Sequence, residues 1–329
     1  MTQKPTSFDN VRQLKEAFPE AFDDEGRLKI TGEMGIKRLP QDMSGLRYLS
    51  LIGIGDDITL PRRIITSHGV EFLDCNGLEA ITSQIIVKGE SKYDPGIVRL
   101  GKCPDLKYLA GGIKTQNLDI YGCPKLKEIS HNVDISHTLH VMDSNVSQVN
   151  CDLNLTESVI FTRTLTERFN GTVRSPKLYL QSLENLEQFA FRPEITKMIG
   201  IWRCPKLRNL PNLACEGIQG ISLGELPSIT SLPEIACGHD VNLFSMEGLT
   251  HLDVNSLKVN GCLEIADCPN LTELPDSPTI GNRLGSLNIE KQEGVHVTRA
   301  LWDHMDGRIH LGQHPVPPVE PIFDEPSPH

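Results

Sequence analysis

Residues 118–129 read LDIYGCPKLKEI, and this phrase decides the fold. As a template it is L-x-I-x-x-C-P-x-L-x-x-L, with four apolar positions, a cysteine and a proline at fixed offsets. It returns as IGIWRCPKLRNL at 199–210 and as LEIADCPNLTEL at 263–274, and more loosely at 98–109 and 70–81. One copy could not bury its own apolar face. The phrase therefore predicts a repeat structure in which each copy packs on two neighbours.

The spacing of the copies indicates the kind of repeat. The second apolar residue of the phrase serves as an index, and it falls at Ile30, Leu51, Phe72, Leu100, Ile120, Val141, Ile160, Leu180, Ile201, Leu223, Leu243, Ile265 and Ile289. The mean separation is about 21.6 residues, which lies in the range of leucine-rich repeats and below that of paired-helix repeats. The L-x-I segment predicts a short strand with its apolar side chains inward, and strands of successive turns form one parallel sheet.

The template also carries a resemblance to a known family. The phrase resembles the L-x-L-x-x-C-x-x-L of cysteine-containing leucine-rich repeats, and its C-P-x-L-x-x-L-P form is similar to plant immune-receptor repeats. The L-P pairs resemble short bacterial repeats; these pairs are Leu39-Pro40, Leu210-Pro211, Leu232-Pro233 and Leu274-Pro275. The resemblance covers about residues 28–311. It implies an α/β repeat, a right-handed solenoid with a concave parallel sheet and short helical caps. It implies little about function, because the fold serves many unrelated binding tasks.

We expect four segments along the chain: an N-terminal helical cap at 1–27, the solenoid at 28–297, a C-terminal cap at 298–314 and a proline-rich tail at 315–329. The N-terminal cap rests on helical spacing of apolar residues between 8 and 18, stopped by Pro19. One separation of 28 residues, between Phe72 and Leu100, predicts about seven extra residues within Ile86–Gly96, as a protruding loop or a small hairpin. Between Val141 and Leu180 the cysteine signature is absent, so the register is least determined there.

Composition limits the classes of partner and the cellular compartment that we expect for this protein. A formal net charge of −11 argues against general binding to nucleic acid or to an anionic membrane, which needs clustered Lys and Arg. The N-terminus has no apolar signal segment, and no apolar run is long enough to cross a membrane. We therefore expect a cytoplasmic protein with reduced, structural cysteines, with delivery into a host cell as the alternative. The cysteines that share the template position are Cys75, Cys103, Cys123, Cys204 and Cys268.

No sequence motif of an enzyme is present. We find no G-x-S-x-G, phosphate-binding loop or dinucleotide-binding glycine pattern, and no C-x-x-C pair for zinc. The sequence therefore predicts no catalytic activity, no cofactor and no metal. An enzyme with an unrecognised site remains an alternative, because Asp119 and His140 are expected one turn apart on the same face.

The candidate binding residues come from the outward positions on either side of the index. The position after it is repeatedly apolar or aromatic, where a solvent-facing position favours polar residues. The predicted partner-binding residues are Asp119, Tyr121, His140, Met142, Phe161, Tyr179, Trp202, Arg203 and Phe244. Trp202 is the expected anchor, with Gly200 leaving its ring room to project and Arg203 supplying a charged rim.

These observations predict a non-enzymatic module that binds a protein partner through the concave sheet. The resemblance to bacterial repeat proteins suggests an effector, or a phage-encoded inhibitor of a host or defence protein. A glycan-binding protein is the alternative, because aromatic rows on a solenoid also stack sugars. The sequence leaves the identity of the partner and the oligomeric state open.

Overall fold

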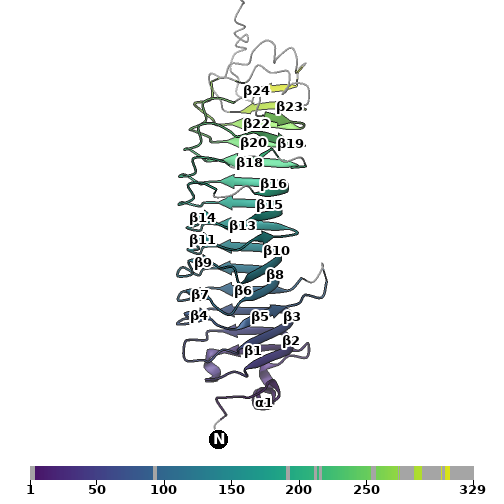
Figure 1. Cartoon of the computed structure of the whole chain (residues 1–329), viewed down its shortest axis with the longest axis vertical. Coiled ribbons are helices and arrows are strands. Elements are labelled where there is room, and N and C mark those ends of the chain that lie inside the picture. The colour runs from purple at the N-terminus through teal and green to yellow at the C-terminus, as the bar shows by residue number, and fades with distance from the viewer. Residues whose placement is uncertain are drawn as a thin grey trace, which may run out of the picture. The chain divides into compact units, whose positions relative to one another are not determined.

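The computed structural model describes the chain except for residues 1–3, 92–94, 190–192, 211–212, 215–216, 253–256, 273, 275–284, 291–304, 306–307 and 312–329, and it describes only the backbone of Ala214 and Leu311. The chain divides into two compact units, residues 1–175 and 176–329. Each unit is a parallel β-solenoid whose turns repeat about every 21 residues. Figure 1 shows the strands of each unit lying one beside the next.

In the first unit, bent or broken strands form the main sheet. Those strands are β1 (Arg27–Thr31), β2 (Asp42–Ile52), β3 (Arg63–Leu73), β5 (Gln84–Val87), β6 (Ile97–Gly101), β8 (Ile113–Tyr121), β10 (Val133–Met142), β12 (Leu153–Asn154) and β13 (Ser158–Thr162). The named strands of this sheet pair in parallel, and each index residue except Ile160 lies opposite that of the next turn, as Leu100 lies opposite Ile120. Strand β15 (Val173–Gln181) contains the boundary between the units.

The second unit continues the same alternation of buried and outward residues. Its main-sheet strands are β16 (Glu194–Trp202), β18 (Gly220–Gly224), β20 (Asp240–Phe244), β22 (Cys262–Ala266), β23 (Ser286–Glu290) and β24 (Ile309–Leu311). The inward positions Ile201, Leu223, Leu243 and Ile265 are fully buried. The predicted inward orientation of the L-x-I pair is confirmed in this unit.

The second side of each turn consists of short strands rather than helices. In the first unit these strands are β4 (Ala80–Ile81), β7 (Tyr108–Leu109), β9 (Glu128–Ile129), β11 (Gln148–Val149) and β14 (Arg168–Phe169), and in the second β17 (Leu213–Ala214), β19 (Ile235–Cys237) and β21 (Leu257–Val259). The α/β character that the resemblance implied is therefore not what the described residues form. Each segment places only two or three residues on this side, which is too short for a helical turn but enough for one ladder step.

In almost every turn, the main-sheet strand is followed by a residue in the left-handed backbone conformation. The residue two positions after the index has a positive φ, for example 50° at Lys102 and 53° at Arg203. This conformation costs free energy for a residue with a Cβ. The cost is offset because the N–H of nearly all of these residues bonds to the next turn, as Lys102 does to the Tyr121 carbonyl at 2.8 Å and Arg203 to the Gly224 carbonyl at 3.1 Å.

The template cysteines follow this left-handed residue and are fully buried, as predicted. The Cys103 thiol donates to the Gly101 carbonyl at 3.3 Å, and the Cys204 thiol donates to the Trp202 carbonyl at 3.4 Å. The eight cysteines that the structure describes are all free thiols, and Cys215 lies outside the described residues. A small side chain with a weak donor thus closes the corner of the turn.

Thiol accessibility gives a first testable prediction. Burial raises the pKa of Cys151 and Cys204 to about 12, so both thiols are protonated and unreactive at pH 8. Of the described cysteines, only Cys262 is more than marginally exposed. Of the eight described thiols, we expect about one to react promptly with a disulfide reagent in the native protein, and we expect about nine thiols of the whole chain to react after unfolding without reductant. A count well below nine in the unfolded protein would reveal disulfides.

The N-terminal segment contains α1 (Val11–Ala17), the one α-helix that the described residues form in full. A 3₁₀-helix, η1 (Pro19–Ala21), follows it, and a second 3₁₀-helix, η2 (Gly32–Met34), follows β1. Asn10 caps α1 by accepting from the Gln13 N–H at 2.9 Å. Phe8, Leu14 and Phe18 are buried. The predicted helix before Pro19 is therefore confirmed. The predicted C-terminal helix and the proline-rich tail lie almost entirely outside the described residues.

The long turn between Phe72 and Leu100 differs from its prediction. Ile86 and Val87 belong to β5, which pairs with β3 and β8 inside the main sheet. The extra residues follow Val87, at the corner where other turns pass directly from one half of the strand to the other. The returning chain is held there because the Gly96 N–H donates to Gln116 Oε1 at 2.6 Å.

Candidate functional site

The outward face of the main sheet carries the predicted binding residues. In the first unit, Tyr121 and Met142 are half-buried on this face, and in the second unit Trp202 and Phe244 are. Asp119, His140 and Tyr179 are also half-buried at the position before the index, and Arg203 is exposed. The outward orientation of these residues is confirmed, and their role in binding stays a prediction.

Phe161 is the exception, and its predicted outward placement is wrong. Strand pairing sets Val141 opposite Phe161 and Met142 opposite Thr162, so Phe161 takes the index position instead of Ile160. The Phe161 side chain is 0% exposed, and its ring lies edge-on to that of Phe169 with centroids 5.0 Å apart. Phe161 is part of the core of the first unit.

The outward aromatic rings lie flat on glycines. A Cβ added to Gly101 would lie 2.2 Å from Tyr121 Cζ, and one added to Gly224 would lie 2.1 Å from Phe244 Cζ. The same holds for Gly200, where an added Cβ would lie 2.2 Å from Trp202 Cη2. One face of each ring therefore covers glycine backbone and the other is left to solvent. The prediction that Gly200 leaves room for the Trp202 ring to project is therefore wrong. The ring lies flat against the sheet, over Gly200.

The second unit carries its outward aromatic residues on one face of the sheet, with Tyr179, Met198 and Trp202 in contact and Phe244 two strands beyond Trp202. The Tyr179 and Trp202 rings are nearly parallel, at 11°, with centroids 6.0 Å apart. The Trp202 indole N–H donates to Ser222 Oγ at 3.0 Å, which fixes the ring orientation. Met198, at 41% exposure, is one of the most exposed large apolar side chains in the described chain. We call Tyr179, Met198, Trp202 and Phe244 the aromatic cluster.

The first unit presents a polar row beside its apolar residues. Glu71 accepts from Tyr48 Oη at 3.1 Å and from Ser50 Oγ at 2.6 Å. Arg99 lies 3.6 Å from carboxylate oxygens of both Glu71 and Asp119. Burial and the Glu71 charge raise the pKa of Tyr48 to about 12, so its hydroxyl stays protonated and donates to Glu71. His140 continues this row directly opposite Asp119.

Arg203, which was expected to supply a charged rim, lies one position beyond the outward strand residues. It is the left-handed residue of its turn, and its Nε donates to both carboxylate oxygens of Glu225, at 2.9 and 2.8 Å. Asp143 and Arg163 form the equivalent pair in the first unit. These exposed pairs line the corner at the end of the strands, and Arg203 is a charged edge rather than part of the aromatic cluster.

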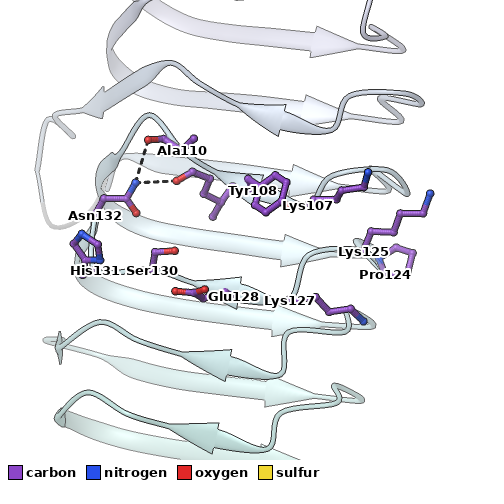
Figure 2. A pocket seen from close by; sticks show the side chains of 11 residues that line it. Lys107, Tyr108, Ala110, Pro124, Lys125, Lys127, Glu128, Ser130, His131 and Asn132 are labelled. Carbon is purple, nitrogen blue, oxygen red and sulfur yellow. Dashed lines mark hydrogen bonds between the residues drawn. The ribbon is translucent and has the colours of Figure 1, made fainter.

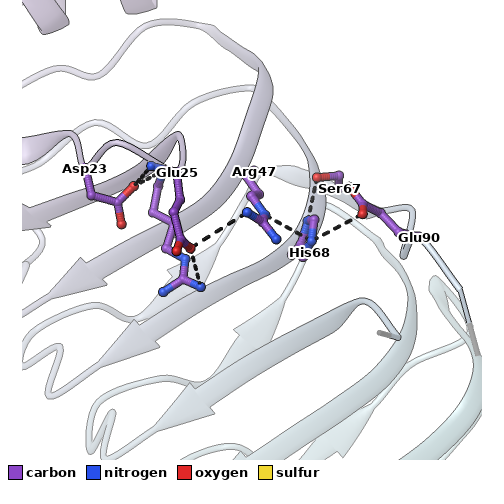
Figure 3. Close-up of polar contacts among 7 residues, drawn as sticks. Asp23, Glu25, Arg47, Ser67, His68 and Glu90 are labelled. Carbon is purple, nitrogen blue, oxygen red and sulfur yellow. Dashed lines mark hydrogen bonds and ion pairs between the residues drawn. The ribbon is translucent and has the colours of Figure 1, made fainter. Parts of the chain in front are cut away.

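Ser67, His68 and Glu90 form a constellation that invites comparison with a hydrolase (Figure 3). Ser67 Oγ lies 2.7 Å from His68 Nδ1, and His68 Nε2 lies 3.6 Å from Glu90 Oε2. Arg47 Nε, however, donates to His68 Nε2 at 3.0 Å. The imidazole proton then sits on Nδ1 and is donated to Ser67, the reverse of the polarity that activates a serine nucleophile. The cluster joins Arg47 to the loop that carries Glu90.

Two kinds of feature are absent from the described residues. Among them, no group of three or more His, Cys, Asp or Glu side chains is arranged to hold a metal ion. Within the same residues, no helix has the length and apolar character needed to span a membrane.

Sequence reasoning missed Tyr48 and Met198, because both lie on halves of bent strands that the template does not cover. Tyr48 covers Gly69 in the same way that Tyr121 covers Gly101. The sequence does contain a pattern that indicates such rings: an outward glycine lies about one turn away from each of Tyr48, Tyr121 and Phe244.

Comparisons with known proteins return no match: no family model fits the chain, and no curated protein or solved structure is significantly similar to it.

Proposed function

We propose that the protein is a non-enzymatic binding module that recognises a protein partner through the outward face of its main sheet, with the aromatic cluster as the principal contact. The observation that carries this proposal is the half-exposed cluster of Tyr179, Met198, Trp202 and Phe244. Exposed apolar patches of this kind mark partner sites, and Trp and Tyr dominate interface energies.

The geometry of the cluster favours binding in two ways. The Trp202 ring is already held by Gly200 and Ser222, so little side-chain entropy is lost when a partner covers it. The first unit has an outward face of its own with mixed character, where the aliphatic residues Ile52 and Leu73 accompany the charged row of Glu71, Arg99 and Asp119, and such a face suits a protein surface. The free cysteines fit a reducing compartment such as the cytoplasm.

Trp202→Ala is expected to weaken partner capture about thirtyfold, the loss typical of a central aromatic residue in an interface. The test is affinity capture from a lysate of the native organism with the wild-type chain and the variant as baits, followed by titration of the captured protein. Arg208→Ala is the matched control, because Arg208 is exposed in the same unit but lies outside the main sheet. Equal capture by Trp202→Ala and wild type would contradict the proposal.

Glycan binding is the second candidate, and the flat rings favour it. A ring whose inner face covers glycine leaves its outer face open to stack against a sugar, and Ser222 and Asn242 lie on the same strand faces as hydrogen-bonding groups. Binding that survives high salt and is competed by simple oligosaccharides would favour this candidate. Salt-sensitive binding to a protein would favour the first.

A further inference from the structure

The hydrogen-bond ladder on the second side of the first unit is interrupted at one place. Strands β4 and β7 pair with each other, and β9, β11 and β14 form a separate parallel sheet. β7 and β9 belong to successive turns whose main-sheet strands, β6 and β8, are fully paired. These two turns are therefore hydrogen-bonded through their main-sheet strands, but their short strands β7 and β9 are not paired with each other.

The regular ladder on either side shows which groups are left over. Between β4 and β7, the Ala110 N–H donates to the Ile81 carbonyl at 2.9 Å. Between β9 and β11, the Asn150 N–H donates to the Ile129 carbonyl at 2.8 Å. The equivalent bond from the Ser130 N–H to the Leu109 carbonyl is absent, and so is that from the Glu128 N–H to the Lys107 carbonyl. Strand β9 thus presents an edge toward β7.

A groove of about 600 Å³ occupies this break and is lined by residues of both turns (Figure 2). The Asn132 side chain partly bridges it, because Nδ2 donates to the Leu109 carbonyl at 2.8 Å. Its Oδ1 is buried and accepts no hydrogen bond within the described chain. The junction therefore leaves polar groups unsatisfied that the other turns pair, which is uncommon in a folded protein.

The side chains around the groove indicate what kind of chain would fit it. Tyr108 is 62% exposed, the highest value for a large apolar side chain among the described residues. Lys107, Lys125 and Lys127 also line the groove, in a protein with a net charge of −11. Lys107 and Lys125 pair with Glu79 and Asp105 at 2.8 and 2.6 Å, but these pairs are partly exposed, and a ligand carboxylate can compete for them.

We propose that this groove binds an extended, acidic peptide segment of a partner protein, which adds a strand to the open edge of β9. The peptide main chain would pair with the Glu128 and Ser130 N–H groups, as in other cases of strand addition. Its acidic side chains would meet the three lysines, and an apolar side chain would cover Tyr108. This site is separate from the aromatic cluster and does not depend on the function proposed for it.

Amide hydrogen exchange tests the open edge directly. In the free protein, the Glu128 and Ser130 amides should exchange faster than the Ile129 amide between them, which faces β11. Addition of an acetylated, amidated peptide of alternating glutamate and valine, eight residues long, should slow exchange at Glu128 and Ser130. Equal exchange at all three amides in the free protein, or no slowing by peptide, would overturn the proposal.

Variants of the groove are compared by their affinity for the same peptide, which is labelled with fluorescein and followed by fluorescence anisotropy. Lys127→Glu and Tyr108→Ala should each weaken binding about tenfold. Lys88→Glu, an exposed lysine of the same unit outside the groove, should not. A peptide with lysine in place of glutamate, or with alternate N-methyl groups, should bind at least about tenfold more weakly.

Three outcomes would count against the proposal. Binding that is indifferent to N-methylation would exclude strand addition, and binding lost equally in Lys88→Glu would show a general charge effect. Concentration-dependent dimerisation of the free chain that Lys127→Glu abolishes would assign the groove to a second copy of this chain. Trp202→Ala should leave peptide binding unchanged, which separates this test from that of the proposed function.

Discussion

Phe161→Ala is expected to lower the free energy of unfolding by about 3–5 kcal/mol, the range found for removal of a buried phenylalanine ring. The Phe161 ring is fully buried and packs edge-on against Phe169, which is also buried. The alanine side chain would leave a cavity between two turns that are joined by ladder hydrogen bonds and cannot close around it. Urea denaturation followed by circular dichroism measures the change.

Tyr121→Ala is the matched control for Phe161→Ala, because it removes a ring of similar size from the outward face of the same unit. Tyr121 is only half-buried over Gly101, so we expect a loss of about 1 kcal/mol. If Phe161→Ala proved no more destabilising than Tyr121→Ala, the inward assignment of Phe161 would be wrong.

Ile201→Ala is expected to cost about 2–5 kcal/mol in the second unit, through the cavity left by a buried aliphatic side chain. Ile201 is 0% exposed and lies opposite Leu223 in the next turn. Each turn of a solenoid packs only on its neighbours, so the missing contacts are not replaced from elsewhere. Thermal and urea denaturation should both show the loss, without a change in strand content at low temperature.

The neighbouring residue provides the comparison, since Ile201 and Trp202 point to opposite faces of one strand. Trp202→Ala removes a larger side chain but one that is half-exposed, so we expect it to cost less stability than Ile201→Ala. The reverse order would show that Trp202 belongs to the core, and the candidate binding face of the second unit would be lost with it.

The template residues of the core could be predicted from the sequence because each is reinforced by its neighbours in the ladder. Cysteine and the index aliphatic residue recur at one offset, and a residue repeated at a single position of a solenoid stacks on its own kind. The buried Cys103 and Cys123 and the half-exposed Tyr121 and Trp202 follow from that offset and the alternation of a strand.

Phe161 could not be placed in this way. Its stretch, Val159-Ile160-Phe161-Thr162, has apolar residues at consecutive positions and lacks the template cysteine. Because side chains alternate with a period of two, a shift of one residue exchanges the two faces, and both registers bury an apolar set. Pairing with β10, together with the Phe169 ring beside it, decided between them.

The remaining features were decided only by the tertiary structure, because each depends on residues in different turns. Whether Phe244 projects or lies flat depends on Gly224, one turn away, and the edge at β9 exists because Leu109 and Ser130 fail to meet. The sequence by itself determined the repeat, its period and the inward face, since these arise from local alternation and recurrence. Contacts between turns about 20 residues apart determined which outward groups are covered and which remain open.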